Sequence, residues 1–159
     1  MPPQPAVKAA VDSAAAALSA AGYEVIPLDP PDLDELAERW RILLGTETKA
    51  GMMDIVQAMG SPEVNQAISW MLGDVSDVDL AGYANILGER TRHLRSWQMF
   101  MDDTPLVLSP VSQEIPVLAG DDIASKERML ELLQVQTMLV VGNYLATKIE
   151  QRTERCHNM

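Results

Sequence analysis

One segment, residues 79–110, limits the folds open to this chain more than any other part of the sequence. Residues 79–101 place Leu, Tyr, Trp and Met at helical spacing, which predicts one long amphipathic helix. The Asp102–Asp103 pair follows, and the apolar run Pro105–Leu108 then stops at Ser109–Pro110. A short apolar run bounded by turn-forming residues is typical of a buried strand. The segment therefore predicts a long helix that leads into a short strand.

The rest of the chain predicts a mostly helical protein of the α/β class with about two short strands. An Ala-rich helix over residues 4–21 is followed by Gly22, which suits the left-handed position that closes a helix, and by a short strand over residues 23–28. Asp32 with Glu35 matches a capping box for the next helix. Further elements are expected as follows: helices from about 33 to 49, between Gly51 and Gly60, from Ser61–Pro62 onward and from near Ser125 through Val140, with a loop over 111–122. No repeat, low-complexity tract or linker divides the chain.

Composition and charge argue against several classes of function. A net charge of −11 disfavours nucleic-acid binding, which needs clustered Lys and Arg, and docking on anionic membranes. The apolar run Met138–Val141 is far shorter than the roughly 20 residues of a membrane span, and the chain opens on polar, Pro-rich residues rather than a leader peptide. One Cys provides no disulfide framework, so the cytoplasm is the expected compartment. Ten Met and few aromatic residues give an adaptable core, typical of a piece that packs against more protein.

Three blocks of residues occur in an order and spacing that point to one family. The first block is an Ala- and Val-rich helix start, then a Gly and an extended run: Ala6–Val11, Leu18–Val25 and Leu28–Pro31. The second block combines residues of the long helix with the strand after it: Tyr83, Arg90, Trp97, Phe100, Asp103 and Leu106–Pro110. The third block is Gly142–Leu145. Together they resemble the C-terminal part of amidase signature enzymes, across most of residues 6–145.

The resemblance implies a partial amidase-signature fold and a reaction, the hydrolysis of a carboxylic amide to an acid and ammonia. The family uses a Ser–cis-Ser–Lys triad, and its Lys and its Gly-rich loop with both serines are expected upstream of the resembling blocks. The nine glycines of this chain are too far apart to form such a loop. We therefore expect a truncated amidase that is inactive alone, with no catalytic residue, metal or cofactor. It would meet a small amide substrate only within an intact enzyme, and its substrate-binding residues stay unassigned.

The resemblance also suggests a boundary within the chain. After Leu145 the expected Gly-Leu-Pro strand is replaced by polar residues. We therefore expect residues 1–145 to be a C-terminal fragment of an amidase-like domain and residues 146–159 to be a divergent polar tail, as truncation or a frame change would produce. In the intact family this region helps to wall the acyl pocket. Trp40, Trp70 and the Met residues are therefore candidates for pocket lining, with core packing as the alternative.

Several side chains could carry chemistry, and for each a plainer role is favoured. Ser125–Lys126 is the only adjacent Ser–Lys pair, but neighbours on a helix point about 100° apart, so a helix cap and a solvated charge are expected. Ser109 has no Lys or His near it in sequence, which favours packing or a turn. Cys156–His157 with Met159 offers too few ligands for a structural metal and lies where chains fray.

The long helix carries a cationic group that could bind a carboxylate. His93 lies among Arg90, Arg92 and Arg95, a set suited to charge-assisted hydrogen bonds. A solvated face that pairs with Glu89 or a distant acid is the favoured alternative. Three aspartates lie nearby in the sequence: Asp74, Asp77 and Asp79. They lack the Gly and the distal Glu of a calcium loop, so we expect them to serve as loop residues and helix caps.

Two other functions stay open. One is a non-enzymatic interaction module that forms homo- or hetero-complexes through exposed apolar faces, with an amidase or another helical partner. The other is an unrelated helical binding domain that folds by itself as a cooperative monomer.

Overall fold

The computed structural model of this chain describes residues 2–146. Within that range the chain forms seven α-helices and one 3-10 helix, and no β-strand. The expected α/β class with about two short strands is therefore wrong. The helices are α1 (Pro5–Ala20), α2 (Leu33–Gly51), α3 (Met53–Met59), α4 (Pro62–Gly73), α5 (Leu80–Asp103), η1 (Asp121–Ile123), α6 (Lys126–Gln134) and α7 (Thr137–Leu145).

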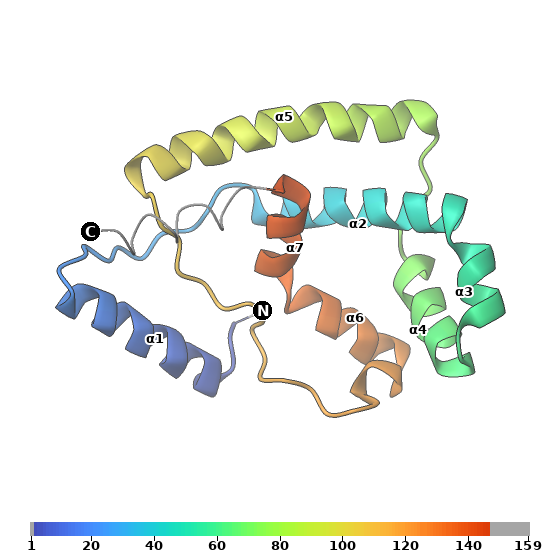
Figure 1. Cartoon of the computed structure of the whole chain (residues 1–159), viewed down its shortest axis with the longest axis horizontal. Coiled ribbons are helices and arrows are strands. Elements are labelled where there is room, and N and C mark those ends of the chain that lie inside the picture. Colours follow the sequence, from blue (N-terminus) through green and yellow to red (C-terminus); the bar gives the residue numbers. More distant parts are fainter. Residues whose placement is uncertain (1, 147–159) are drawn as a thin grey trace.

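The core lies where α2, α5 and α7 meet. The long helix α5 runs alongside α2, and the short helix α7 packs against both (Figure 1). Leu36 of α2 is fully buried, and Val141 and Leu145 of α7 are each 1% exposed. Trp97 of α5 is also buried, and its indole N–H donates to Pro31 O at 3.1 Å, which ties α5 to the start of α2. Three helices from distant parts of the sequence therefore share one core.

A second group of helices, α3, α4 and α6, packs at the other end of α2 (Figure 1). Gly45 of α2 permits the close approach of the loop that follows α4. A Cβ added at Gly45 would lie 2.7 Å from Cγ1 of Val75, a buried residue of that loop. A larger residue at this position would force the Val75 side chain to shift.

The two predicted strands are absent because neither segment has a partner strand. Residues 24–30 and 106–110 are irregular, and no backbone hydrogen bond joins them to any other described residue. A strand needs a neighbour that accepts and donates its backbone hydrogen bonds. An apolar run can favour a strand, but it cannot supply that neighbour. The side chains stay in contact with solvent instead, with Ile26 54% and Leu106 50% exposed.

The helix ends confirm some local predictions and contradict others. Gly22 takes a left-handed φ of +94° and closes α1, and the Ser61 hydroxyl accepts from Val64 N at the start of α4. The capping box at Asp32 is wrong, because this residue is itself left-handed at φ 57° and its side chain makes no cap hydrogen bond. A left-handed backbone turns the Asp32 carboxylate away from the N–H groups that it was expected to accept from.

The predicted single C-terminal helix is two helices. α6 ends at Gln134 and α7 begins at Thr137. The loop before α6 contacts the chain at this break: Gln113 N donates to Val135 O at 2.8 Å. The Thr137 hydroxyl also donates to Gln134 O at 2.8 Å. Tertiary hydrogen bonding at the break therefore redirects the chain, so that α7 turns into the core.

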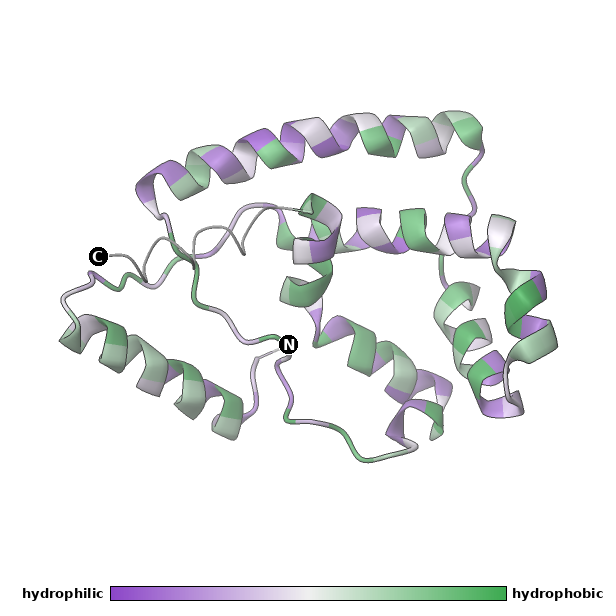
Figure 2. Ribbon diagram, in the orientation of Figure 1, coloured by the Kyte–Doolittle hydropathy of each residue, from purple (hydrophilic) through white to green (hydrophobic). Residues whose placement is uncertain are grey.

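One side of the molecule, residues 2–30 and 104–120, is open, and we call it the open side. None of its residues is buried. α1 lies apart from the core helices, and hydrophobic colours cover most of its length (Figure 2). Its start is held by Gln4, whose N–H donates to Gln113 O at 2.8 Å and whose Oε1 accepts from Ile115 N at 3.3 Å. Of the helices described, none is both long enough and apolar enough to cross a membrane.

The Leu36→Ala substitution tests the core. We expect it to lower the free energy of unfolding by about 2–5 kcal/mol, because a fully buried leucine side chain leaves a cavity. Leu80→Ala, at a helical position that is 83% exposed, is the matched control and should change stability by less than about 0.5 kcal/mol. Urea unfolding followed by circular dichroism measures both. Equal losses of stability in the two variants would contradict the burial of Leu36 in the core formed by α2, α5 and α7.

Arg128 of α6 fastens the loop that precedes it. Its NH2 group lies 2.7 Å from Glu114 Oε2 and 2.8 Å from Asp121 Oδ2. The hydrogen bond from Arg128 lowers the pKa of the Glu114 carboxyl. A carboxyl whose pKa is lower in the folded state stabilises that state when it is ionised. Its contribution is complete above the ordinary carboxyl pKa of about 4.3 and is lost as the pH falls through the lowered value.

This linkage predicts a pH-dependent effect of Glu114→Gln. The variant should melt at a lower temperature than the parent at pH 7. The difference should shrink as the pH falls below the ordinary carboxyl pKa of about 4.3 and disappear once the pH is below the lowered pKa of Glu114, where the parent carboxylate is protonated too. Thermal melts across this pH range measure the difference. Glu24→Gln is the control, because Glu24 is exposed and has no hydrogen-bonded or ion-paired side chain among the described residues. A constant difference between parent and Glu114→Gln at all pH values would contradict the ion pair.

Candidate functional site

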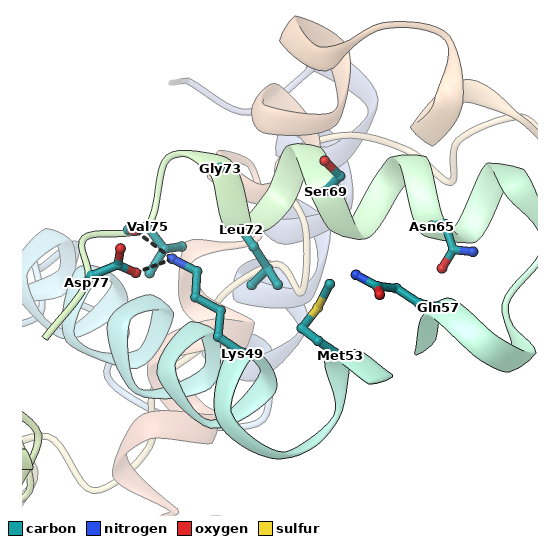
Figure 3. Close-up of a pocket in the computed structure, with 9 residues that line it drawn as sticks. All are labelled: Lys49, Met53, Gln57, Asn65, Ser69, Leu72, Gly73, Val75 and Asp77. Atoms are coloured by element: carbon teal, nitrogen blue, oxygen red, sulfur yellow. Dashed lines mark hydrogen bonds and ion pairs between the residues drawn. The ribbon is translucent and has the colours of Figure 1, made fainter. Parts of the chain in front are cut away.

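A pocket of about 420 Å³ lies where the end of α2 meets α3, α4 and the loop after α4. Figure 3 shows its lining, with Lys49 from α2, Gln57 from α3, and Asn65 and Ser69 from α4. Apolar surface comes from Leu72 and its neighbours. The pocket therefore combines several short polar side chains with an apolar wall, the usual composition of a small-molecule site.

An ion pair closes one end of this pocket. Lys49 Nζ lies 2.6 Å from Asp77 Oδ1 and donates to Val75 O at 3.1 Å. These bonds join the end of α2 to the loop after α4 (Figure 3). The lysine and the aspartate are the charged residues of the lining, so their charges cancel.

The α3–α4 turn forms the other end. Asn65 Nδ2 donates to Gly60 O at 3.3 Å, which holds the turn. The Asn65 Oδ1 atom is buried and has no hydrogen-bond partner among the described residues. A Cβ at Gly60 would lie 2.6 Å from Val56 O, so the turn accepts glycine alone without moving. A buried acceptor without a donor is costly, typically by about 1–3 kcal/mol.

Sequence reasoning did not find this pocket. Its polar residues come from α2, α3, α4 and the loop after α4, and each looks like an ordinary surface residue in the sequence. The available indication was the pair Gly51 and Gly60, which bracket a helix too short to be stable alone. A helix of that kind has to pack on its neighbours, and the pocket lies between it and α4.

The pocket has the features of a binding site rather than a catalytic centre. Ser69 and Lys49 both line it, but no hydrogen bond joins their side chains, and the Lys49 ammonium is paired with Asp77. A serine nucleophile needs a base within hydrogen-bond reach. Elsewhere in residues 2–146, no hydrogen bond joins a serine hydroxyl to the side chain of a Lys or His.

The serine residues singled out in the sequence take structural positions. The Ser125 hydroxyl accepts from Arg128 N at 3.1 Å and caps α6, as expected. Lys126 forms an ion pair with Asp74 at 2.9 Å and is partly exposed, which agrees with a solvated charge. Ser109 is half-buried on the open side.

His93 is fully buried, so the expected solvated face is wrong at this residue. Its Nδ1 lies 3.1 Å from the Tyr144 hydroxyl, and its Nε2 lies 2.8 Å from an amino group of Arg92. Arginine can only donate, so Nε2 acts as the acceptor and the ring proton belongs on Nδ1, directed at Tyr144. Burial raises the pKa of the Tyr144 hydroxyl. This pair joins α5 to α7 inside the core.

The arginines around His93 have different partners. Arg92 pairs with Glu35 of α2 at 3.1 Å, which confirms the predicted pairing with a distant acid. Arg90 donates from Nε to Tyr144 O at 2.6 Å and from NH2 to Leu145 O at 3.1 Å. It therefore satisfies carbonyl groups at the end of α7 and does not form a carboxylate-binding cluster with its neighbours.

The acidic loop residues also behave as expected from the sequence. Asp79 accepts from Gly82 N and caps α5, while Asp74 and Asp77 form ion pairs with lysines. The described residues contain no group of three or more His, Cys, Asp or Glu that could hold a metal ion. Cys156–His157, Met159 and nearly all of the predicted polar tail, 146–159, lie outside the described residues.

The tryptophan candidates lie away from the larger pocket. Trp40 packs against the core and lines a second cavity of about 20 Å³, which has room for roughly one water molecule. Trp70 is half-buried on α4. Among the methionines, Met53 lines the larger pocket. Core packing therefore describes Trp40, and a lining role fits Met53.

Comparisons with known proteins link the chain to hydrolases. No family model matches it. It is 30% identical over 132 residues to an indoleacetamide hydrolase of Bradyrhizobium japonicum, which covers 80% of this chain and 28% of that protein. It is also 30% identical over 128 residues to an indoleacetamide hydrolase of Bradyrhizobium diazoefficiens strain USDA 110, which covers 80% of this chain and 24% of that protein.

The chain resembles amidases in sequence. It spans about a quarter of the length of the curated relatives that it matches. The similarity supports the amidase and hydrolase part of the sequence interpretation, at the level of a sequence relationship.

The Tyr144→Phe substitution tests the buried pair. It keeps the ring but removes the hydroxyl, so the buried N–H of His93 loses its partner, and we expect a loss of about 1–3 kcal/mol in the free energy of unfolding. Tyr23→Phe is the matched control, because Tyr23 is 48% exposed, and it should be close to neutral. Urea unfolding at neutral pH compares the two. If both variants unfold at the same urea concentration as the parent, the contact between His93 and Tyr144 does not stabilise the fold.

Proposed function

We propose that this chain is a segment of an amidase-like hydrolase and corresponds to the C-terminal part of an amidase-signature fold. The hydrolase would cleave the C–N bond of a carboxylic amide and release an acid and ammonia. The observation that carries the proposal is the 30% identity to two indoleacetamide hydrolases over 80% of this chain, within about a quarter of their length. A cytoplasmic location is part of the proposal, supported by the single Cys.

The proposal includes that the chain is catalytically inactive by itself. Amide hydrolysis needs an activated nucleophile, a base and donors that stabilise the oxyanion. Within residues 2–146, no side chain of a Lys or His is hydrogen-bonded to Ser109 or Ser125, and His93 is fully buried between α5 and α7 without access to a substrate. The reacting groups would therefore come from other parts of an assembled hydrolase, and a small amide substrate would be met in that assembly.

The open side supports a role within a larger assembly. It combines the unburied helix α1 with apolar side chains that are about half exposed, such as Tyr23, Leu28 and Leu108. Exposed apolar side chains gathered on one side of a protein favour contact with further protein. In the relatives, the region that aligns with this chain is joined to a much longer polypeptide. The proposed role of the open side is to pack against the rest of such a hydrolase.

A graft tests the proposal. The aligned region of the B. japonicum relative is replaced by the matching residues of this chain, and ammonia release from indoleacetamide is measured. The hybrid should be active, whereas a hybrid with an unrelated helical segment of equal length should be inactive. The purified chain alone should release no ammonia. Release by the chain alone that is lost in Ser109→Ala or Ser125→Ala would overturn the proposed dependence on other segments.

The second candidate function is a non-enzymatic interaction module, and the open side favours this function as well. A module would form a stoichiometric homo- or hetero-complex through α1 and the neighbouring apolar residues. Affinity capture with the parent chain, compared with a variant that carries Ile26→Lys and Leu108→Lys, distinguishes the two cases. Capture of chaperones alone, equally by both proteins, would exclude the module.

A further inference from the structure

Helix α3 carries a row of apolar side chains that face solvent. Met52, Ile55 and Met59 are 54%, 59% and 83% exposed. Met52 is the residue directly before α3, and the spacings of three and four residues put these side chains on one face of the helix. Hydrophobic colours mark parts of α3 in Figure 2. We call these three residues the α3 ridge, and the rest of the described chain leaves it uncovered.

Another face of α3 packs against the protein. Met53 and Val56 are half-buried, and α3 contacts both α2 and α4. A helix of seven residues depends on such contacts, because it is too short to be stable alone. The fold does not account for the apolar character of the ridge, since a helix face in water normally carries polar residues.

The hairpin formed by α3 and α4 carries negative charge only. Residues 50–88 contain five acidic residues and no Lys, Arg or His. Two of the acids are paired with lysines from elsewhere in the chain. Asp54 of α3 and Glu63, in the first turn of α4, form no ion pair with any described residue. The helices at the ridge therefore carry two carboxylates whose charge is not balanced.

This charge selects among the surfaces that could cover the ridge. A second copy of the chain would bring the same two carboxylates and a further net charge of −11. An anionic membrane would meet the same repulsion. A partner with Lys or Arg beside an apolar face would cover the ridge and pair with Asp54 and Glu63 at the same time.

The ridge also favours one partner structure, a helix. A partner strand needs a free sheet edge, and residues 2–146 contain no strand. Helices contact one another through rows of side chains spaced three and four residues apart, which is the spacing of the ridge. Two of the three ridge residues are Met, whose flexible side chain adapts to different apolar surfaces.

We propose that the α3 ridge docks a basic amphipathic helix of another protein. The ridge contacts the apolar face of that helix, and Asp54 and Glu63 pair with its Lys or Arg side chains. α3 lies far from α1 along the long axis of the molecule, so the ridge is separate from the open side (Figure 1). The inference goes beyond the proposed hydrolytic role and does not depend on it.

Binding of a designed peptide to the full chain tests the docking surface. The probe is a peptide of Leu and Lys whose leucines share one helical face, and the comparison has Glu in place of every Lys. In fluorescence anisotropy the basic peptide should bind on the order of tenfold tighter or more than the acidic peptide. Its affinity should fall as salt is added. Equal binding of the two peptides, or no binding of the basic one, would overturn the inference.

A matched pair of variants locates the contact. Ile55→Gln combined with Met59→Gln changes two exposed ridge residues, so the fold is preserved, and it should weaken binding of the basic peptide by about tenfold or more. Leu106→Gln combined with Leu118→Gln makes a similar change at exposed residues of the open side and should bind like the parent. Circular dichroism checks that both proteins are folded. Equal affinity of the two variants refutes the ridge as the site.

A second pair separates docking from general attraction between an acidic protein and a basic peptide. Asp54→Asn with Glu63→Gln removes two charges at the ridge, and Glu24→Gln with Asp29→Asn removes two from exposed residues of the open side. The net charge of the two variants is equal, but only the first should bind the basic peptide more weakly than the parent does. Equal losses in both variants would show general attraction and contradict docking at the ridge.

Self-association is measured on the same proteins. Sedimentation velocity should show the parent as a species whose size does not change when Ile55→Gln and Met59→Gln are introduced. A dimer of the parent that is lost in this variant would assign the ridge to a second copy of the chain and overturn the proposed partner.

Discussion

The rest of the structure depends on the packing of α7 against α2 and α5. This helix has nine residues, too few for stability in water by itself, and four of them are buried: Val140, Val141, Tyr144 and Leu145. Its end is fixed by Arg90, which donates to two of its carbonyl groups. Its Tyr144 hydroxyl meets the buried His93. One short C-terminal helix therefore joins segments that are more than fifty residues away in sequence.

The packing of α7 against α2 and α5 explains why one part of the molecule is well packed while another part is open. α2 extends beyond the core and supports α3, α4 and α6, which makes room for the polar pocket between them (Figure 3). On the opposite side, α1 and the apolar segments around Ile26 and Leu106 have nothing in the described chain to cover them. The same chain thus has a well-packed part with a pocket of its own and an open side that is suited to further protein. The similarity to a quarter of two longer hydrolases agrees with this division.

Local features of the sequence predicted much of the helical structure. Ser61 and Ser125 cap their helices, and Gly22 ends α1, because each of these effects needs only residues within a turn of one another. The prediction at Asp32 was wrong, since the left-handed backbone there moves the carboxylate away from the helix start. The interpretation of the sequence as part of an amidase rested on the order of three blocks of residues along the chain, which no local pattern provides. The comparisons support the amidase and hydrolase part of that interpretation.

The sequence by itself determined most of the helices, the caps at Ser61 and Ser125 and the charge of the surface, since these depend on side-chain chemistry at short range. Only the tertiary structure decided whether the apolar runs would become strands, because pairing needs a second strand that the described residues do not provide. It also decided that Gln113 interrupts the last helix at Val135, that His93 is buried, and that Lys49, Gln57 and Asn65 share one pocket. Each of these outcomes rests on contacts between distant residues, and periodicity along one segment carries no information about which distant residue will be there.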